Sequence, residues 1–148
     1  MIIALSQYLS EDLIVKSQVI TKLSEDLGSF FINKNYGNAL HKIVIGIICV
    51  NPVFEKFFKP RKPMYTKDKE VREIDIPIEV EKCLEFDIKL GYEDFRNVGN
   101  EESLKLVGKA IVASIPMLDK IRIDDFDVKS FKADLMNFLT SSRIIASG

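Results

Sequence analysis

The sequence is poor in the residues from which catalytic and metal sites are usually built. It has one histidine, His41, two cysteines, Cys49 and Cys83, and no tryptophan among its 148 residues. Two cysteines and one histidine make no zinc pattern, and neither cysteine lies in a glycine-rich elbow or near a helix start that would lower its pKa. The seven glycines are scattered and form no phosphate-binding loop. We therefore expect no catalytic residue, no metal site and no cofactor.

Net charge and long apolar runs are also scarce. The formal net charge is -1, so the chain as a whole does not attract nucleic acid or an anionic membrane. No stretch approaches the roughly 20 apolar residues that span a bilayer, and the first residues lack the basic segment of a signal peptide. These absences predict a cytoplasmic protein without a membrane partner, in which both cysteines are buried thiols rather than a disulfide.

The first half of the chain has clear strand and helix patterns. Ile and Leu dominate residues 2–9 and predict a strand, and Ser10 is the expected N-cap of a long helix that ends near residues 33–35. The nearly unbroken apolar run of residues 41–50 predicts a central strand covered on both faces. Gly46 in its middle indicates a bulge or a close approach by another backbone.

The strictest alternation lies in residues 74–90. Its even positions are apolar and its odd positions are mostly acidic, which predicts an antiparallel pair of strands with one face in water. We expect the even positions to be buried, as for Phe86 and Ile88. The odd positions, such as Glu85 and Asp87, should be exposed.

Two further helices complete the chain. Asn100 is the candidate cap of the first, and Pro116 should kink or end that helix about two residues earlier. Asp127 is the candidate cap of the second. Phe126 before this cap can pack on Phe131 inside the helix, which is the pattern of a hydrophobic staple.

The expected order of elements is strand, helix, strand, strand, strand, helix, helix (β-α-β-β-β-α-α). A single sheet with helices packed on it is the simplest way to bury all the apolar stripes. We therefore predict a two-layer α+β fold, in which a mostly antiparallel sheet of about four strands packs with three main helices. The first strand can run parallel to the second, because a helix joins them. Residues 1–148 are expected to form a single globular domain.

Acidic side chains line one face of the predicted hairpin. Residues 73–89 hold six acids against Lys82 and Lys89, a local net charge of -4. A solvated sheet face is the simplest explanation of this pattern. The alternative is a docking surface for a basic partner, because like charges aligned on one face speed association. On that hypothesis the candidate partner-binding residues are Asp75, Glu79, Glu81, Glu85 and Asp87.

A basic and aromatic segment, residues 54–72, precedes and enters the hairpin. Its basic residues are Lys56, Lys59, Arg61, Lys62, Lys67, Lys69 and Arg72, and its aromatic residues are Phe54, Phe57, Phe58 and Tyr65. Such a mixture is typical of platforms that bind single-stranded nucleic acid. The slightly acidic charge of the whole chain makes nucleic acid an unfavoured partner. The simpler interpretation is intramolecular, since the segment leads directly into the acidic hairpin.

Four segments carry a recognisable combination of patterns. They are residues 45–52 (IGIICVNP), 57–63 (FFKPRKP), 84–90 (LEFDIKL) and 125–128 (DFDV), the last followed by an amphipathic helix. Together they resemble small immunity proteins of bacterial polymorphic toxin and contact-dependent competition systems.

The resemblance implies a cytoplasmic protein that is not an enzyme and that neutralises a cognate toxin domain by direct stoichiometric binding. Many such proteins are acidic because many of their toxins are basic nucleases. The charge of -1 departs from that pattern and leaves the class of toxin open. The alternative function is a small nucleic-acid-binding or regulatory domain that uses residues 54–72. An enzyme of unknown type is the third hypothesis, because sequence does not exclude a cryptic pocket.

Overall fold

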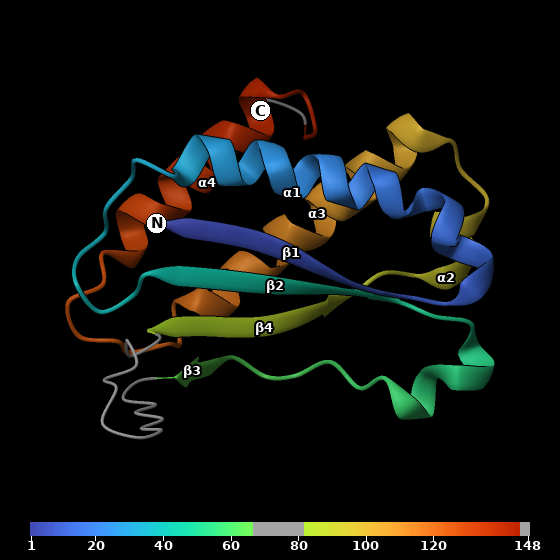
Figure 1. Ribbon diagram of the computed structural model, residues 1–148, viewed down its shortest axis with the longest axis horizontal. Helices are drawn as coiled ribbons and strands as arrows, with labels where there is room; N and C mark the ends of the chain where they lie inside the picture. The colour runs from blue at the N-terminus through green and yellow to red at the C-terminus, as the bar shows by residue number, and fades with distance from the viewer. Residues whose placement is uncertain (67–81, 146–148) are drawn as a thin grey trace, which may run out of the picture.

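A computed structural model describes residues 1–66 and 82–145. Along the chain its elements are β1 (Ile2–Leu9), the 3-10 helix η1 (Glu11–Lys16), α1 (Ser17–Phe31), β2 (Lys42–Cys49), the 3-10 helix η2 (Pro52–Phe57), β3 (Met64–Thr66), β4 (Cys83–Lys89), α2 (Tyr92–Arg96), α3 (Asn100–Leu118) and α4 (Val128–Ser141). Figure 1 shows α3 crossing behind the strands and α1 running along β1. We call the face of the sheet turned away from these helices the outer face.

The sheet is mostly parallel, which corrects the predicted antiparallel arrangement. Its strand order is β1-β2-β4-β3; β1, β2 and β4 are parallel, and the short β3 runs antiparallel to β4. The prediction was wrong because alternation shows which face of a strand is buried but carries no information on strand direction. Residues 74–81, which include most of the expected first strand of the hairpin, lie outside the described residues.

Strand β2 is central, as its apolar run predicted. It pairs with β1 on one side and β4 on the other. Ile43, Ile45 and Ile47 point toward the helices and are at most 2% exposed. In β4, Phe86 and Ile88 are buried, also as predicted. These side chains form one core with the apolar faces of α1, α3 and α4.

Helix α1 covers the free edge of β1. The Oγ of Ser24 accepts a hydrogen bond from the Leu5 N–H at 2.9 Å. A Cβ built on Gly28 would lie 3.5 Å from the Ile3 carbonyl oxygen, an ordinary van der Waals distance, so this turn of the helix lies against the strand. The contact reduces the length of edge that could pair with another chain.

The boundaries of the first helix and of α3 differ from the prediction. The first helix begins as the 3-10 turn η1, and the Ser10 hydroxyl does not cap it but accepts a hydrogen bond from the Asn51 N–H at 3.1 Å. The cap position of α3 is Gly99, and the helix continues through Pro116 to Leu118. Pro116 lies in the last turn, so the one backbone hydrogen bond that its missing N–H costs lies near the end of the helix.

The start of α4 is confirmed in both predicted respects. The carboxylate of Asp127 accepts hydrogen bonds from the hydroxyl and the N–H of Ser130, and these bonds lower the pKa of the carboxyl. The rings of Phe126 and Phe131 are 5.9 Å apart, as expected for a hydrophobic staple. Local sequence therefore determines where this helix begins.

Candidate partner-binding surface

The two thiols lie in the interior, and the histidine lies at the surface. Cys49 and Cys83 are buried thiols and not a disulfide, as predicted. Burial raises the pKa of the Cys49 thiol to about 11, so the thiol stays protonated at neutral pH and is a poor nucleophile. His41 is exposed at the start of β2. Within residues 1–66 and 82–145, no three His, Cys, Asp or Glu side chains lie close enough together to hold a metal ion.

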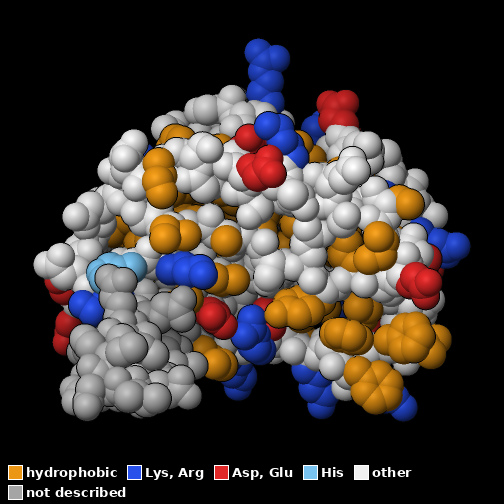
Figure 2. Space-filling model, in the orientation of Figure 1, with side chains coloured by type: hydrophobic (Ala, Val, Ile, Leu, Met, Phe, Trp, Pro, Cys, Tyr) orange, Lys and Arg blue, Asp and Glu red, His pale blue; other side chains and the backbone are white. Residues whose placement is uncertain are grey.

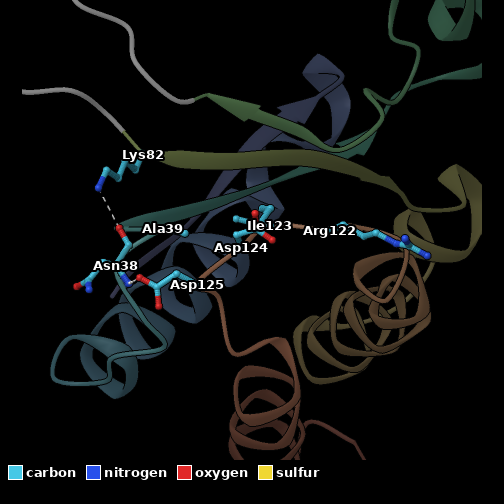
Figure 3. A pocket seen from close by; sticks show the side chains of 7 residues that line it. All are labelled: Asn38, Ala39, Lys82, Arg122, Ile123, Asp124 and Asp125. Atoms are coloured by element: carbon cyan, nitrogen blue, oxygen red, sulfur yellow. Dashed lines mark hydrogen bonds between the residues drawn. The ribbon is translucent and has the colours of Figure 1, made fainter.

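A hollow of about 410 Å³ lies beside the amino-terminal ends of β2 and β4 (Figure 3). The carboxylate of Asp125 accepts a hydrogen bond from the Asn38 N–H at 3.0 Å, and the Lys82 ammonium donates to the Asn38 carbonyl at 3.0 Å. Arg122 extends away from these groups in Figure 3. The hydrogen bonds join two loops, and the hollow lies at the end of the sheet opposite to the one where parallel sheets usually bind ligands. We assign it a structural role.

A buried lysine, Lys16, has the same kind of structural role. Its ammonium donates to the carbonyls of Phe95 and Val98 and to the Ser103 hydroxyl. Burial lowers the pKa of this group. Because an ammonium has three N–H donors and all three are used, Lys16 joins η1 to the end of α2 and the start of α3 and has no donor left for a ligand.

The predicted acidic surface is altered by the structure. Asp75, Glu79 and Glu81 lie outside the described residues, so their partner-binding role stays a prediction. The Asp87 side chain is only 3% exposed and the Glu85 side chain is 35% exposed. The expected exposure of Asp87 is therefore wrong, because a side chain from another segment covers its face of β4.

That covering residue is Arg61, from the basic segment. Its Nε lies 3.0 Å and its backbone N–H nitrogen 2.8 Å from Oδ2 of Asp87, and its terminal nitrogens lie 3.1 Å from Oδ1 of Asp87 and 2.9 Å from Oε2 of Glu85. The Asp87 N–H also donates to the Arg61 carbonyl at 3.2 Å. The hydrogen bonds to Asp87 raise the pKa of the Arg61 guanidinium above its ordinary value. The intramolecular interpretation of the basic segment thus holds for this residue.

Gly46 provides the space in which the Asp87 carboxylate lies. The two residues are register partners on the outer face, and a Cβ on Gly46 would lie 2.1 Å from Oδ1 of Asp87. It would also lie 3.3 Å from Cε2 of Tyr8. The close approach predicted at Gly46 is real, but the approaching group is a side chain instead of a backbone.

A second ion pair holds η2 against the same strand. Nζ of Lys89 lies 2.7 Å from Oε1 of Glu55, at the edge of the outer face. The segment that follows β2 is therefore attached to β4 at two points, Glu55 and Arg61. Its intervening residues are held in place by these contacts even though they form no long element.

The segment around η2 and the neighbouring strands β1 and β3 expose a group of large apolar side chains. Phe57 is 69% exposed and Phe54 is 49% exposed. Figure 2 shows hydrophobic side chains gathered over η2 and the adjacent part of the sheet, with lysine and arginine side chains projecting around them. We call this group the aromatic surface, and its members are Tyr8, Val53, Phe54, Phe57, Phe58 and Met64.

Three exposed lysines, Lys56, Lys59 and Lys62, accompany the aromatic surface. Nζ of Lys56 lies 5.1 Å from the centre of the Phe57 ring. In the described part of the chain, none of the three lysines has a carboxylate within ion-pair distance. Among the residues that the structure describes, their positive charges are therefore not compensated by an ion pair.

Sequence reasoning found the three phenylalanines but missed Tyr8, Val53 and Met64. Tyr8 belongs to the first strand, whose buried Ile3 and Leu5 occupy odd positions, so alternation could have placed Tyr8 on the opposite face. Met64 shares the outer face because it pairs with Glu85. No signal in the sequence indicates that pairing, since the two residues are brought together only by the sheet.

Comparison with known proteins identifies a family. Within the described residues, no helix is long and apolar enough to cross a membrane. No curated protein and no solved structure matches the chain. The family model described as immunity protein 44 matches residues 1–141, and the chain therefore belongs to that immunity protein family.

Proposed function

We propose that this protein neutralises a cognate bacterial toxin domain by binding it directly in a stoichiometric complex. Membership of an immunity protein family supports a toxin as the partner. The observation that carries the proposal is the aromatic surface, in which Phe54 and Phe57 stay exposed on a segment held by two ion pairs. Exposed apolar groups of this kind mark interaction sites, and a surface ordered before binding loses less entropy on association.

The proposal includes a role without catalysis and a site of action in the cytoplasm. Cys49 and Cys83 are thiols and not a disulfide, which is the usual state in a reducing compartment. Inhibition by binding needs a complementary surface but no reactive group. The amount of toxin inhibited should therefore equal the amount of protein added and should not grow with time.

The test uses the purified protein and the purified toxin domain encoded next to it. Size-exclusion chromatography with light scattering should show a complex of fixed stoichiometry, and titration of toxin activity should reach zero at that same ratio. Inactivation of a molar excess of toxin would contradict the proposal, because it requires turnover.

A second candidate function is a small nucleic-acid-binding domain that uses residues 54–72. The three uncompensated lysines beside exposed phenylalanine rings favour it, because such platforms stack bases on aromatic rings and track phosphates with cations. Binding of a single-stranded oligonucleotide at physiological salt, with a steep dependence on salt concentration, would support this alternative.

A further inference from the structure

We infer that the aromatic surface, together with Lys56, Lys59 and Lys62, is the site at which the toxin docks, and that the matching toxin surface has an apolar centre and an acidic rim. This inference rests on the proposed function and assigns to it a surface and a partner chemistry.

The local charges define the rim of the partner. Among the described residues around the aromatic surface there are five cations (Lys56, Lys59, Arg61, Lys62 and Lys89) and three carboxylates (Glu55, Glu85 and Asp87), a local net charge of +2 on a chain whose total is -1. All three carboxylates are engaged by Arg61 or Lys89. The charge of these described residues that is left without an ion pair is positive, so it attracts carboxylates and repels a basic partner.

The apolar side chains define the centre. Phe57 and Phe54 extend from η2 with most or about half of their surface in water. Aromatic side chains at the centre of an interface commonly dominate its affinity, whereas charges at the rim chiefly set the rate of association. Rings surrounded by lysines are the composition of a docking surface. Its rings should chiefly set the dissociation rate, and its lysines should chiefly set the association rate.

The ion pairs beneath the surface give it a fixed shape. Arg61 is joined to Asp87 through its side chain and through both backbone groups, and Glu55 is joined to Lys89. Glu85 and Asp87 are thus positioning residues for the segment; Asp87 is covered, and Glu85 stays partly exposed but is paired with Arg61. The docking surface inferred here therefore has the opposite sign to the acidic face predicted from sequence.

A second copy of this chain is a poor occupant of the surface. Two copies related by a twofold axis through this surface would each bring the same three lysines into one interface. Like charges facing each other across an interface disfavour association, so the surface selects a partner of different composition.

The experiment compares two sets of variants and matched controls for binding to the inactivated toxin domain by surface plasmon resonance. The first variant is Phe54→Ala with Phe57→Ala. Its control is Val15→Ala with Ile32→Ala, which removes exposed apolar groups that are 83% and 55% exposed elsewhere. The variant should weaken binding by at least about 30-fold through faster dissociation. The control should bind within about twofold of the wild type.

The second variant replaces Lys56, Lys59 and Lys62 by Glu. Its control replaces Lys109, Lys120 and Lys129 by Glu, which changes the net charge equally on other exposed positions. The variant should associate about tenfold more slowly and should lose the decrease of association rate with salt. The control should keep the wild-type rate within about threefold. Unchanged circular dichroism and melting temperature show that each variant is folded.

Each remaining outcome overturns a different statement. If the wild type binds the toxin and both variants bind equally well, docking occurs elsewhere and this inference is wrong while the proposed function stands. If the wild type does not bind the toxin, the proposed function fails. If the wild type binds a single-stranded oligonucleotide instead, and the two variants abolish that binding, the surface is a nucleic-acid platform.

Discussion

At the scale of single residues, Gly46 shows how one missing side chain permits a buried ion pair. Its Cα faces the carboxylate of Asp87, which is held by Arg61 and cannot move aside freely. A glycine within a central strand loses packing and chain entropy, so its presence indicates a specific steric requirement. Here the requirement comes from a residue 41 positions away in the sequence.

We predict that Gly46→Ala lowers the free energy of unfolding by about 2–4 kcal/mol, because a Cβ 2.1 Å from Oδ1 of Asp87 displaces the carboxylate from Arg61. Urea denaturation followed by circular dichroism measures this change. The control is Gly99→Ala, where a Cβ meets nothing within 4 Å and the loss should stay under about 1 kcal/mol. Equal losses in the two variants would contradict the steric explanation.

The buried thiol of Cys49 predicts a specific pH dependence of stability. Its pKa is raised from 9.0 to about 11 by burial, with a smaller contribution from Asp12. The unfolded chain therefore loses this proton first, so the thiol's contribution to stability is complete below about pH 9 and is lost as the pH rises from 9 to 11. Cys49→Ala should flatten the fall of the free energy of unfolding over this interval, as measured by urea denaturation at several pH values.

The same thiol should resist alkylation in the folded protein. In a Cys83→Ser background, iodoacetamide at pH 8 should modify Cys49 only after denaturant is added, because the native thiol is both protonated and inaccessible. Rapid modification of the native protein, read by mass spectrometry, would show that the thiol is exposed by local opening.

At the scale of elements, helix α4 starts with a residue that favours its cap conformation and ends with a residue that does not. Asp127 caps the start. At the end, the Arg143 N–H donates to the Thr140 carbonyl and the Ile144 N–H donates to the Leu139 carbonyl, which is the Schellman pattern. Arg143 occupies the left-handed position of this motif with φ 58°, where glycine is the preferred residue.

We predict that Arg143→Gly raises the free energy of unfolding by about 0.5–1 kcal/mol, because relief of the left-handed conformation exceeds the added entropy of the unfolded chain. The matched control is Ser142→Gly, at φ -81°, where glycine relieves no strain and should lower stability. A thermal melt of the three proteins gives the ranking. A stabilising Ser142→Gly would show that flexibility of the chain end, and not φ, is the cause.

The strands illustrate what element patterns can predict. The alternation of β4 correctly predicts the burial of Phe86 and Ile88. It predicts the wrong environment for Asp87, because period-2 patterns assume that the second face is open to water. Here the segment containing Arg61 lies on that face and converts an acidic position into half of an ion pair.

At the scale of the whole molecule, one core connects both ends of the described chain. Its buried side chains extend from Ile3 in β1 to Ile144 after α4. Gly108 in α3 allows the end of the chain to pack closely, since a Cβ there would lie 2.2 Å from a methyl carbon of Ile144. The two halves of the sequence therefore share the same interior.

We predict that the whole chain unfolds in one cooperative step, as expected of the single domain inferred from its length. Far-ultraviolet circular dichroism and tyrosine fluorescence should give coincident urea transitions with one slope in the range of about 1–3 kcal/mol per molar urea. Two separated transitions would show that the described core is divided into independently stable units.

The sequence by itself determined the features that depend on near neighbours. These are the central strand of residues 41–50, the cap at Asp127 with its staple, and the burial of the two thiols. Each follows from hydrophobic periodicity or from side chains within a few positions of one another, so the relevant physical contacts are already present in the local order of residues. The resemblance to immunity proteins likewise came from short segments and is confirmed by the family to which the chain belongs.

Only the tertiary structure decided the direction of the strands and the ionic partner of Asp87 and Glu85. Strand direction depends on which chain segments meet in the sheet, and the fate of Asp87 depends on Arg61, 26 residues earlier, and on the space left by Gly46. Within the described residues, Arg61 pairs with both acids of β4, while Lys56, Lys59 and Lys62 have no carboxylate within ion-pair distance. Whether two charged residues far apart in the sequence form an ion pair depends on tertiary contacts, which no local sequence pattern determines.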